Sequence, residues 1–452
     1  MEEAAGKAGE HKVRCQGHRT LKEISQLLAL QGRLCILSMA EILFISPRWP
    51  WPLFDGGRIR IYETLRHLAA RHRVTLLAPV REVDNNTDRG PIPGLCAGVF
   101  SAVRSDRLPA VATRLASGLV RGVPLVQSFF LDKGLAGTVR DLTSSRHFDI
   151  IHVEYPVMAA YLDAVDPICG ARWILSTHNI ESIRFDRETR FSSWDSRRLL
   201  LVGDQLFFKS WEAKAIRRFH GVTAVSDLEK QWIEKNAPGA EVELVPNGVD
   251  ADYFDFTPPG KSHFLTFIGS MDYPPNIDAV LWFGQEILPR LLVEQPDLQF
   301  RVVGSRPDRR VMQLKEIPGI EITGQVPDIR PYLKDSLALV VPLRSGGGTR
   351  LKILQAMAAG CPVVSTTIGA EGLDVTPDLH FLKADSLDAW VAAVRRLDAP
   401  AGSRTEMAKA GRALVDDHYT WSKCLSGLDR LYEKVMKSPV ENRPTEAALR
   451  AS

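Results

Sequence analysis

Short apolar runs alternate with helical patterns along most of the chain, in two successive series. The first series of runs comprises Glu41–Ser46, Val74–Pro79, Ile150–Val153, Trp173–Ser176 and Gly221–Val225. The second comprises Phe264–Ile268, Phe300–Val303, Ile320–Thr323, Leu337–Val341 and Val363–Ser365. Strands that are separated by helices pair in parallel sheets. The pattern therefore predicts an α/β protein built of two doubly wound, Rossmann-like domains.

The boundary between the two series falls near residues 246–260. Pro246-Asn247-Gly248 is a turn signal, and Thr257-Pro258-Pro259-Gly260 has the composition of a linker. We predict a first domain over residues 39–250 and a second over 251–418. The polar residues 1–38 are expected to be a disordered extension or an over-long start, because Met39 directly precedes the first apolar run. The polar tail 438–452 is also expected to be disordered.

Composition narrows the range of partners and compartments. With 452 residues and a net charge of +3, nothing in the chain demands nucleic acid as a partner. The six cysteines are far apart and form no C-x-x-C pair, so the sequence indicates neither a structural zinc site nor a disulfide framework. A reducing compartment, the cytoplasm, is therefore expected. No apolar run approaches the roughly 20 residues that a membrane-spanning helix needs.

One basic amphipathic stretch stands out in the first series. Its alternating residues are Arg104, Leu108, Arg107, Val111, Arg114, Leu115, Leu119 and Arg121. Such a pattern fits docking on an anionic membrane face. A solvated helix that packs on its own domain would show the same pattern, and this is the favoured interpretation.

A glycine-rich turn in the second series carries the strongest functional signal. Gly346, Gly347 and Gly348 follow an apolar strand and precede an amphipathic helix. Glycines let backbone N–H groups approach a ligand closely, and a helix N-terminus favours phosphate. Arg350 and Lys352 add positive charge in the first turn. The turn is therefore predicted to cradle a diphosphate, although an ordinary strand–turn–helix with a solvated basic edge would have a similar pattern.

The helix that follows presents two faces. Leu351, Leu354 and Ala358 share one face and are expected to pack on the sheet. Lys352 and Gln355 share another, so Gln355 is placed to hydrogen-bond a ligand lying along that face.

Ligands of open parallel sheets bind beyond the carboxyl ends of the strands, and two facing domains would enclose them in a cleft. The loops expected to carry the site are Pro47–Gly57, Glu154–Pro156, Thr177–Glu181, Ser226–Asp227, Gly269–Asn276, Gly304–Arg309 and Arg344–Thr349.

An ordered set of motifs across about residues 41–437 resembles the retaining glycosyltransferases of family 4, which have the GT-B fold. The motifs are Ile45-Ser46-Pro47, Asp55-Gly56-Gly57-Arg58, Thr177-His178-Asn179, Ala224-Val225-Ser226-Asp227, Val245-Pro246-Asn247-Gly248-Val249-Asp250, Phe267-Ile268-Gly269-Ser270 and Ala356-Met357-Ala358-Ala359-Gly360-Cys361-Pro362-Val363-Val364. Residues 419–437 resemble the helix that closes the family fold and crosses back to the N-terminal domain.

The resemblance implies an enzyme that moves a sugar from a nucleotide-sugar donor to a glycan or lipid-linked acceptor with retention, in bacterial polysaccharide or glycolipid biosynthesis. The C-terminal domain would hold the donor and the N-terminal domain the acceptor. No metal or other cofactor is expected, because backbone N–H groups and cations stabilise the leaving diphosphate. A cytoplasmic protein, peripheral at the inner face of the membrane, would suit a lipid-linked acceptor.

The resemblance also assigns residues. His178 is expected to hydrogen-bond the transferred sugar, and we predict His178 and Arg350 as the catalytic residues. The predicted donor-binding residues are Gly56, Gly57, Gly269, Gly346, Gly347, Gly348, Thr349, Arg350, Lys352 and Gln355.

The chain departs from the family pattern at the residues that are expected to bind the diphosphate. The family commonly carries an Arg and a Lys just after Gly269, whereas here no cation follows. Arg350 and Lys352 are the expected substitutes, and Arg344 at the end of the strand could also reach.

A second departure concerns two glutamates of the family, which fall on Gly347 and Gln355. A neutral amide makes a weaker hydrogen bond than a carboxylate, so we expect weaker donor binding than with Glu. Glu371 is a further candidate in the cleft.

Two alternatives stay open. A sugar-nucleotide epimerase of similar shape would need a catalytic carboxylate pair, which cannot be assigned. A degenerate family member would bind nucleotide-sugar without turnover, and Gln355 keeps this alternative open. A dehydrogenase is disfavoured because no G-x-G-x-x-G follows the first strand.

Overall fold

The computed structural model describes residues 39–81, 88–105, 107–120, 123–184, 207–347, 350–397 and 402–438. These residues belong to one compact unit that begins at Met39. The expectations for residues 1–38 and 439–452 lie outside the described residues, and so do Gly348 and Thr349.

A seven-stranded sheet forms the first half of this unit, and all of its strand pairings are parallel. Its strand order is β4-β2-β1-β6-β7-β8-β9. The strands are β1 (Glu41–Ile45), β2 (Arg73–Leu77), β4 (Gly98–Phe100), β6 (Ile150–Glu154), β7 (Arg172–Ser176), β8 (Gly221–Ala224) and β9 (Glu241–Leu244), with β3 (Val80–Arg81) and β5 (Val103–Arg104) pairing separately. The sequence predicted the five central strands but missed the edge strands β4 and β9, which are short and partly exposed.

Helices flank this sheet, and the first of them starts at a polar cap. Asp55 accepts a hydrogen bond from the backbone N–H of Arg58 at 3.0 Å, which satisfies a free donor at the start of α2. The helices are α2 (Gly56–Ala69), α3 (Ile92–Leu95), α4 (Leu108–Val120), α5 (Leu125–Ser128), α6 (Lys133–Ser145), η2 (Pro156–Ala164), η3 (Pro167–Cys169) and α9 (Asp227–Asn236).

A six-stranded parallel sheet forms the second half, with the order β12-β11-β10-β13-β14-β15. Its strands are β10 (Phe264–Ile268), β11 (Gln299–Val303), β12 (Ile320–Gly324), β13 (Ala338–Val341), β14 (Val363–Ser365) and β15 (Leu382–Lys383). The five predicted strands of the second series are all present. The sequence missed β15, a two-residue edge strand.

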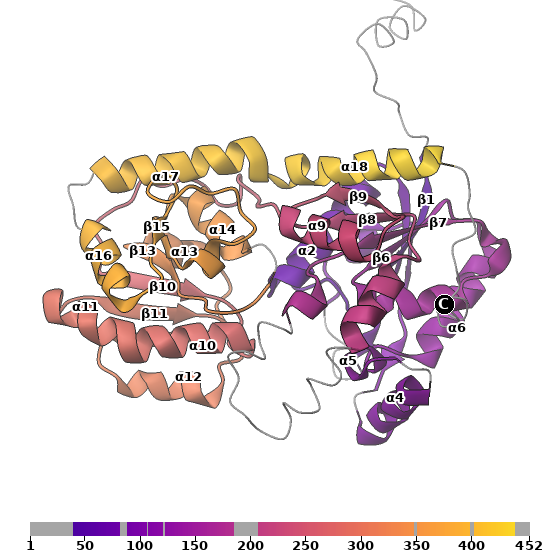
Figure 1. Ribbon diagram of the computed structural model, residues 1–452, viewed down its shortest axis with the longest axis horizontal. Helices are drawn as coiled ribbons and strands as arrows, with labels where there is room; N and C mark the ends of the chain where they lie inside the picture. Colours follow the sequence, from indigo (N-terminus) through magenta and orange to yellow (C-terminus); the bar gives the residue numbers. More distant parts are fainter. Residues whose placement is uncertain are drawn as a thin grey trace, which may run out of the picture. The chain divides into compact units, whose positions relative to one another are not determined.

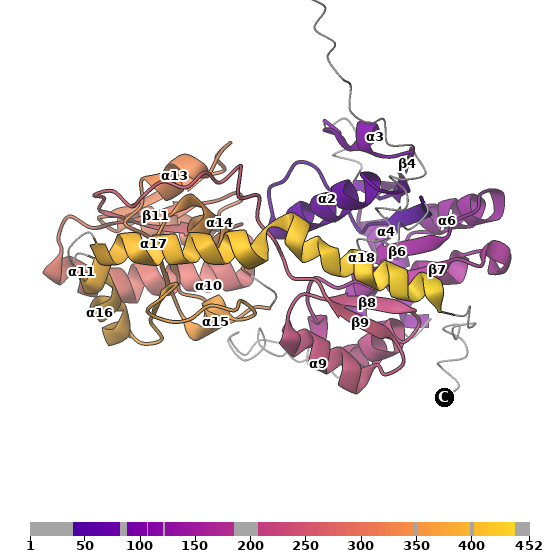
Figure 2. The ribbon, with the colours of Figure 1, turned by 90° about the horizontal axis from the view of Figure 1, so that it is seen from above.

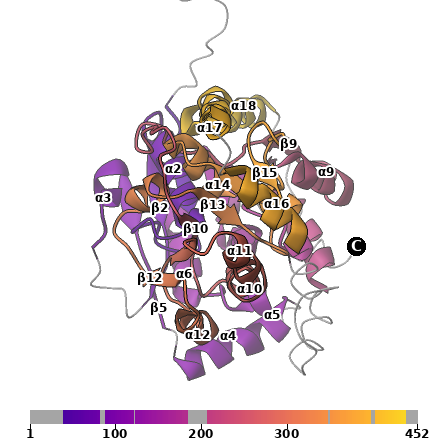
Figure 3. The same ribbon diagram turned by 90° about the vertical axis from the view of Figure 1, so that its left-hand side faces the viewer.

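Helices cover both faces of the second sheet, with α10, α11 and α16 on one side and α14 and α17 on the other (Figure 3). They are α10 (Pro274–Trp282), η4 (Phe283–Ile287), α11 (Leu288–Glu294), α12 (Arg309–Gln313), η5 (Leu314–Glu316), α13 (Arg330–Lys334), α14 (Leu351–Ala359), α15 (Thr367–Ala370), α16 (Leu387–Leu397) and α17 (Gly402–Leu414). Leu351, Leu354 and Ala358 of α14 are buried as expected, and Gly360 ends the helix in a left-handed conformation.

The chain ends by returning to the first sheet. After α17 and η6 (Val415–Tyr419), α18 (Trp421–Lys437) packs on β8 and β9 (Figures 1 and 2). A Cβ added at Gly427 would lie 2.6 Å from the carbonyl oxygen of Leu244, and one added at Gly221 would lie 2.8 Å from Val435. Glycine at both positions therefore allows α18 to approach the first sheet closely.

No helix among the described residues is long and apolar enough to span a bilayer.

Candidate active site

Loops from both sheets meet beyond the carboxyl ends of their strands. A Cβ added at Gly56, at the start of α2, would lie 3.0 Å from Leu351 at the start of α14. A Cβ added at Gly347 would lie 3.4 Å from Oδ1 of Asn179, in the loop that follows β7. A hollow between these loops is lined by Ile180, Ile183, Ser226, Gly347 and Glu371. The structure therefore brings together the loops that the strand pattern singled out.

The glycine turn that follows β13 holds an unusual backbone conformation. Gly346 has a φ of +114°, which side-chain-bearing residues rarely adopt. The buried guanidinium of Arg350 donates to the carbonyl oxygen of Gly347, and a Cβ at Gly346 would lie 3.0 Å from Nη2 of Arg350. Arg350 thus lies against the turn that precedes α14.

Lys352 supplies a cation beside Gly269. Its Nζ donates to Oδ1 of Asn276 at 3.1 Å and lies 3.9 Å from the centre of the Phe267 ring. A Cβ added at Gly269 would lie 3.1 Å from this Nζ. Lys352 forms no ion pair with any residue that the structure describes. Burial lowers the pKa of Lys352 well below its usual range, and the charge of Arg350 lowers the pKa further.

Asn276, which the sequence did not single out, holds this lysine. Its side chain is buried, and its Nδ2 donates to the carbonyl oxygen of Ser270 at 2.9 Å. That bond leaves Oδ1 as the acceptor for Lys352. Asn276 lies at the end of the loop that follows β10, so its place in that loop was the only available signal.

Arg344 does not supply charge at the turn in the way that the sequence suggested. Its guanidinium makes a two-pronged ion pair with Asp278, with N–O distances of 3.0 and 2.5 Å, and lies 5.0 Å from the centre of the Trp282 ring. Asp278 therefore largely neutralises its charge. Gln355, in contrast, is half-buried one helical turn after Lys352 and makes no hydrogen bond with the described residues.

Gly57 has a packing role that sequence alone could not reveal. A Cβ added there would lie 2.7 Å from Oη of Tyr155, well inside van der Waals contact. Tyr155 itself has a φ of +68°, a rare conformation for a bulky residue. The Tyr155 side chain therefore packs against the start of α2, where it leaves no space for a side chain at residue 57.

His178 follows β7 and is buried. Its Nε2 lies 2.5 Å from Oε2 of Glu154, and its ring stacks on Tyr155 with centroids 3.9 Å apart. Burial alone would raise the pKa of the fully buried Glu154, but the adjacent His178 and His152 hold this pKa at about 2. The sequence marked the loop containing Glu154 and Tyr155 without giving either residue a role.

Two further carboxylates hold the loop that carries His178. Glu229 accepts from the backbone N–H of Ile180 at 3.3 Å, and Glu212 accepts from those of Glu181 and Ser182 at 2.8 and 3.0 Å. Burial raises the pKa of both glutamates to about 7. These contacts join segments that are distant in the sequence, so no local sequence pattern could have predicted them.

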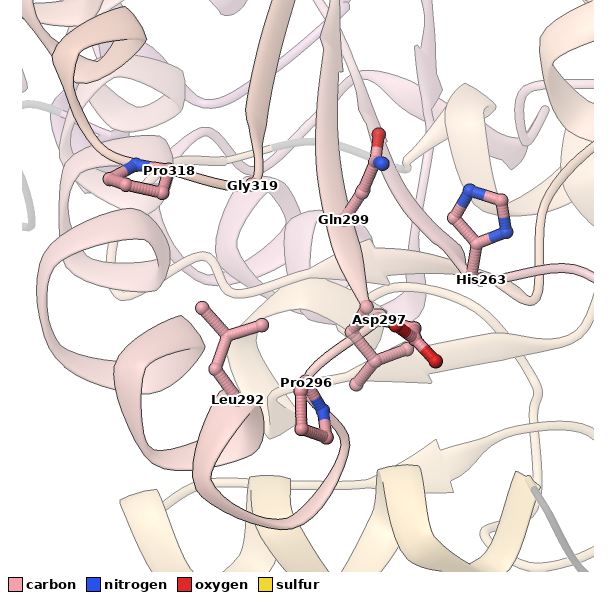
Figure 4. A pocket seen from close by; sticks show the side chains of 8 residues that line it. His263, Leu292, Pro296, Asp297, Gln299, Pro318 and Gly319 are labelled. Carbon is pink, nitrogen blue, oxygen red and sulfur yellow. The ribbon is translucent and has the colours of Figure 1, made fainter.

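Another hollow lies at the amino-terminal ends of two strands of the second sheet, β10 and β11 (Figure 4). Its lining includes His263 and Gln299, which stand at the amino ends of β10 and β11. Ligands of open parallel sheets bind at the carboxyl ends, so this hollow is separate from the candidate site.

Two parallel sheets with meeting strand-end loops, closed by a helix that returns to the first sheet, define the GT-B class. Residues 54–253 match the family model described as Glycosyltransferase Family 4, and residues 262–399 match the one described as Glycosyl transferases group 1. The chain belongs to this glycosyltransferase family and is a nucleotide-sugar-dependent glycosyltransferase.

Two relatives are similar to this chain, and one of them is named as a glycosyltransferase. An "Uncharacterized 44.6 kDa protein in cps region" of Klebsiella pneumoniae is 20% identical over 406 residues, which cover 86% of this chain and 99% of that protein. A "Phosphatidyl-myo-inositol mannosyltransferase" of Mycobacterium tuberculosis is 30% identical over 236 residues. That match covers 48% of this chain and 60% of the mannosyltransferase.

Solved structures share the fold. Sucrose-phosphate synthase from Thermosynechococcus elongatus superposes with a TM-score of 0.62 at 18% identity, covering 88% of this chain and 99% of that one. Anabaena HepE in complex with UDP and glucose superposes with a TM-score of 0.60 at 13% identity, covering 87% and 99%.

Proposed function

We propose that this chain transfers a sugar, with retention, from a nucleotide-sugar donor held at the glycine turn to a glycan or lipid-linked acceptor held by the first-sheet loops. The observation that carries this proposal is the environment of Lys352. Among the residues that the structure describes, the half-buried ammonium of Lys352 has only the neutral Asn276 and Phe267 as partners, and the charge of Arg350 acts on it as well. Buried charges are costly unless paired, so this position favours an anionic ligand.

The diphosphate of a nucleotide-sugar suits this position. Lys352, Arg350 and the backbone N–H groups at the start of α14 would stabilise the negative charge that builds on the leaving diphosphate, with no metal required. Gln355, one turn further along α14, would hydrogen-bond the ribose. His178 would hydrogen-bond the transferred sugar from the opposite sheet.

Known proteins of this fold support the classes of donor and acceptor. HepE has been solved with UDP-glucose, and the mycobacterial relative is named for mannose transfer to phosphatidyl-myo-inositol. We extend to this chain only the general classes, a nucleotide-sugar and a glycan or lipid-linked acceptor.

A donor screen tests the proposal. The purified full chain would be incubated with UDP-, GDP- and dTDP-sugars, and free nucleoside diphosphate would be measured. We expect release with at least one donor, and NMR of the transferred product would show the anomeric configuration of the donor. Interconversion of the sugar nucleotide would instead establish an epimerase, and tight binding without either reaction would establish a binding protein.

A peripheral place on the cytoplasmic face of the membrane completes the proposal. Leu108 and Val120 of α4 are 84% and 87% exposed, and Leu125 and Phe129 nearby are also exposed. Leu108 directly follows Arg107, and an exposed apolar side chain next to a cation suits insertion at an anionic bilayer surface. Co-sedimentation with vesicles containing phosphatidylglycerol is expected for the wild type and reduced at least threefold for Leu108→Ser with Val120→Ser. Equal sedimentation would exclude this surface.

A further inference from the structure

A line of buried hydrogen bonds runs from the crossing helix α18 to His178. Oη of Tyr432 lies 2.8 Å from Nδ1 of His152, whose Nε2 lies 3.2 Å from Oε1 of Glu154. The other oxygen of Glu154 lies 2.5 Å from Nε2 of His178. Tyr432, His152 and Glu154 are each no more than 1% exposed.

The chemistry of Glu154 decides where the protons lie. An ionised carboxylate can only accept, so Nε2 of both histidines must carry the proton. Nδ1 of His152 is then the acceptor for the Tyr432 hydroxyl, which satisfies that ring. Both oxygens of Glu154 are therefore occupied, and the carboxylate is held in one orientation.

The second ring nitrogen of His178 is Nδ1. Its Nδ1 makes no hydrogen bond with any described residue, while the Tyr155 ring covers one face of the imidazole at 3.9 Å. When Nε2 bears the proton, a neutral imidazole presents a lone pair at Nδ1. A lone pair pairs with a hydroxyl and repels a phosphate oxygen.

We propose that Glu154 is a positioning residue that fixes the Nε2–H tautomer of His178, so that Nδ1 accepts a hydrogen bond from a hydroxyl of the transferred sugar. The inference rests on the proposed function and narrows it, because it assigns this side of the site to a sugar hydroxyl and the diphosphate to Lys352. A structural role alone would not need a carboxylate here, since a buried charge is costly and an amide has the same shape.

Several charged groups face His178 and set the sign of its pH dependence. Burial lowers the pKa of His178, Glu154 raises it, and Arg60 and Arg48 lower it. Protonation places a proton on Nδ1 and removes the acceptor. Activity should therefore be lost as pH falls through the pKa of His178, and removing the charge of Glu154 should move this loss to lower pH.

The direct test is the tautomer itself, which needs no substitution of Glu154 and no donor. Two-bond ¹H–¹⁵N spectra of the full chain labelled at histidine, with His178 assigned from a His178→Gln variant, should show the Nε2–H form in the wild type. An Nδ1–H form would overturn the proposal.

Glu154→Gln tests the consequence for catalysis. With the donor selected by the screen above, we expect kcat/KM to fall on the order of 10–100-fold, which corresponds to one buried hydrogen bond left unmade. The acid limb of the pH profile should shift to lower pH and the Nδ1–H form should become visible. Glu63→Gln removes another buried carboxylate of this half, whose ion-pair partner among the described residues is Arg66, and should leave all three unchanged.

The possible failures are distinguishable. If the wild type turns over no donor, the proposed function fails while the tautomer measurement still stands on its own. If the wild type is active and Glu154→Gln retains its rate and its acid limb, the proposed function survives and the role of Glu154 is excluded.

Discussion

At the scale of single residues, Lys352 is the cation that lies beside Gly269 and that we propose binds the diphosphate. Lys352→Met keeps the apolar stem and removes the charge. Because a hydrogen bond to a charged group contributes about 1.5–3 kcal/mol, the Kd for UDP or GDP should rise roughly 10–100-fold. Isothermal titration calorimetry measures this, with Arg344→Met as the matched control because Asp278 already pairs Arg344. Equal losses in both variants would contradict a specific role for Lys352.

The proposed role of Lys352 predicts that donor binding depends on pH. Its pKa in the free protein is lowered by burial and by Arg350, so the ammonium is fully charged only below that lowered pKa. The affinity for a nucleoside diphosphate should therefore be highest at lower pH and should decline as pH rises through the lowered pKa. Titrations from pH 6 to pH 10 would show the decline in the wild type and a flatter profile in Lys352→Met.

Gln355 offers a gain of function. Gln355→Glu restores a carboxylate at a half-buried position with no hydrogen-bond partner among the described residues. A charge-assisted bond is roughly twice as strong as a neutral one, so donor affinity should rise about three- to tenfold. The same calorimetric titration measures the donor affinity of Gln355→Glu. Weaker binding than in the wild type would show that residue 355 lies away from the ribose.

At the scale of elements, the start of α2 depends on the absence of a side chain at Gly57. Gly57→Ala would place a Cβ 2.7 Å from Oη of Tyr155, and displacing this packed ring should cost about 1–3 kcal/mol. Gly137→Ala in α6 is the control, because nothing lies within 4 Å of its Cβ and alanine favours a helix by about 0.5–1 kcal/mol. Differential scanning fluorimetry should show a lower Tm for the first variant and an unchanged or higher Tm for the second.

At the scale of the whole molecule, α18 ties the end of the chain to the first sheet. Leu431 is fully buried and lies against Gly221 of β8. Leu431→Ala should cost about 2–5 kcal/mol through lost burial and a residual cavity, and should lower the Tm. Val293→Ala, at a position that is 82% exposed, should leave the Tm nearly unchanged. A similar Tm for both variants would mean that α18 contributes little to stability.

Most of the fold could be predicted from the sequence because a buried strand appears there as a run of apolar residues. Central strands such as β10 and β13 are nearly continuous apolar runs, since both of their faces are covered. Edge strands such as β15 carry little apolar signal and were missed. The glycine turn was readable for a similar reason, because its glycines, cations and helix are contiguous.

The remaining parts of the candidate site come from contacts across long sequence distances. Asn276 contacts Lys352 across 76 positions, and Tyr432 contacts His152 across 280. Arg344 and Lys352 have equivalent charges in the sequence, and only the position of Asp278 decides which of them is neutralised.

The sequence by itself determined the two-sheet α/β architecture, the glycosyltransferase family and the glycine turn, because periodicity and contiguous motifs are properties of neighbouring residues. Only the tertiary structure decided which cation lies beside Gly269, why Gly57 is glycine and which buried carboxylate contacts His178. Burial and ion pairing depend on distance in space, and the chain folds these groups together from segments that carry no mutual signal.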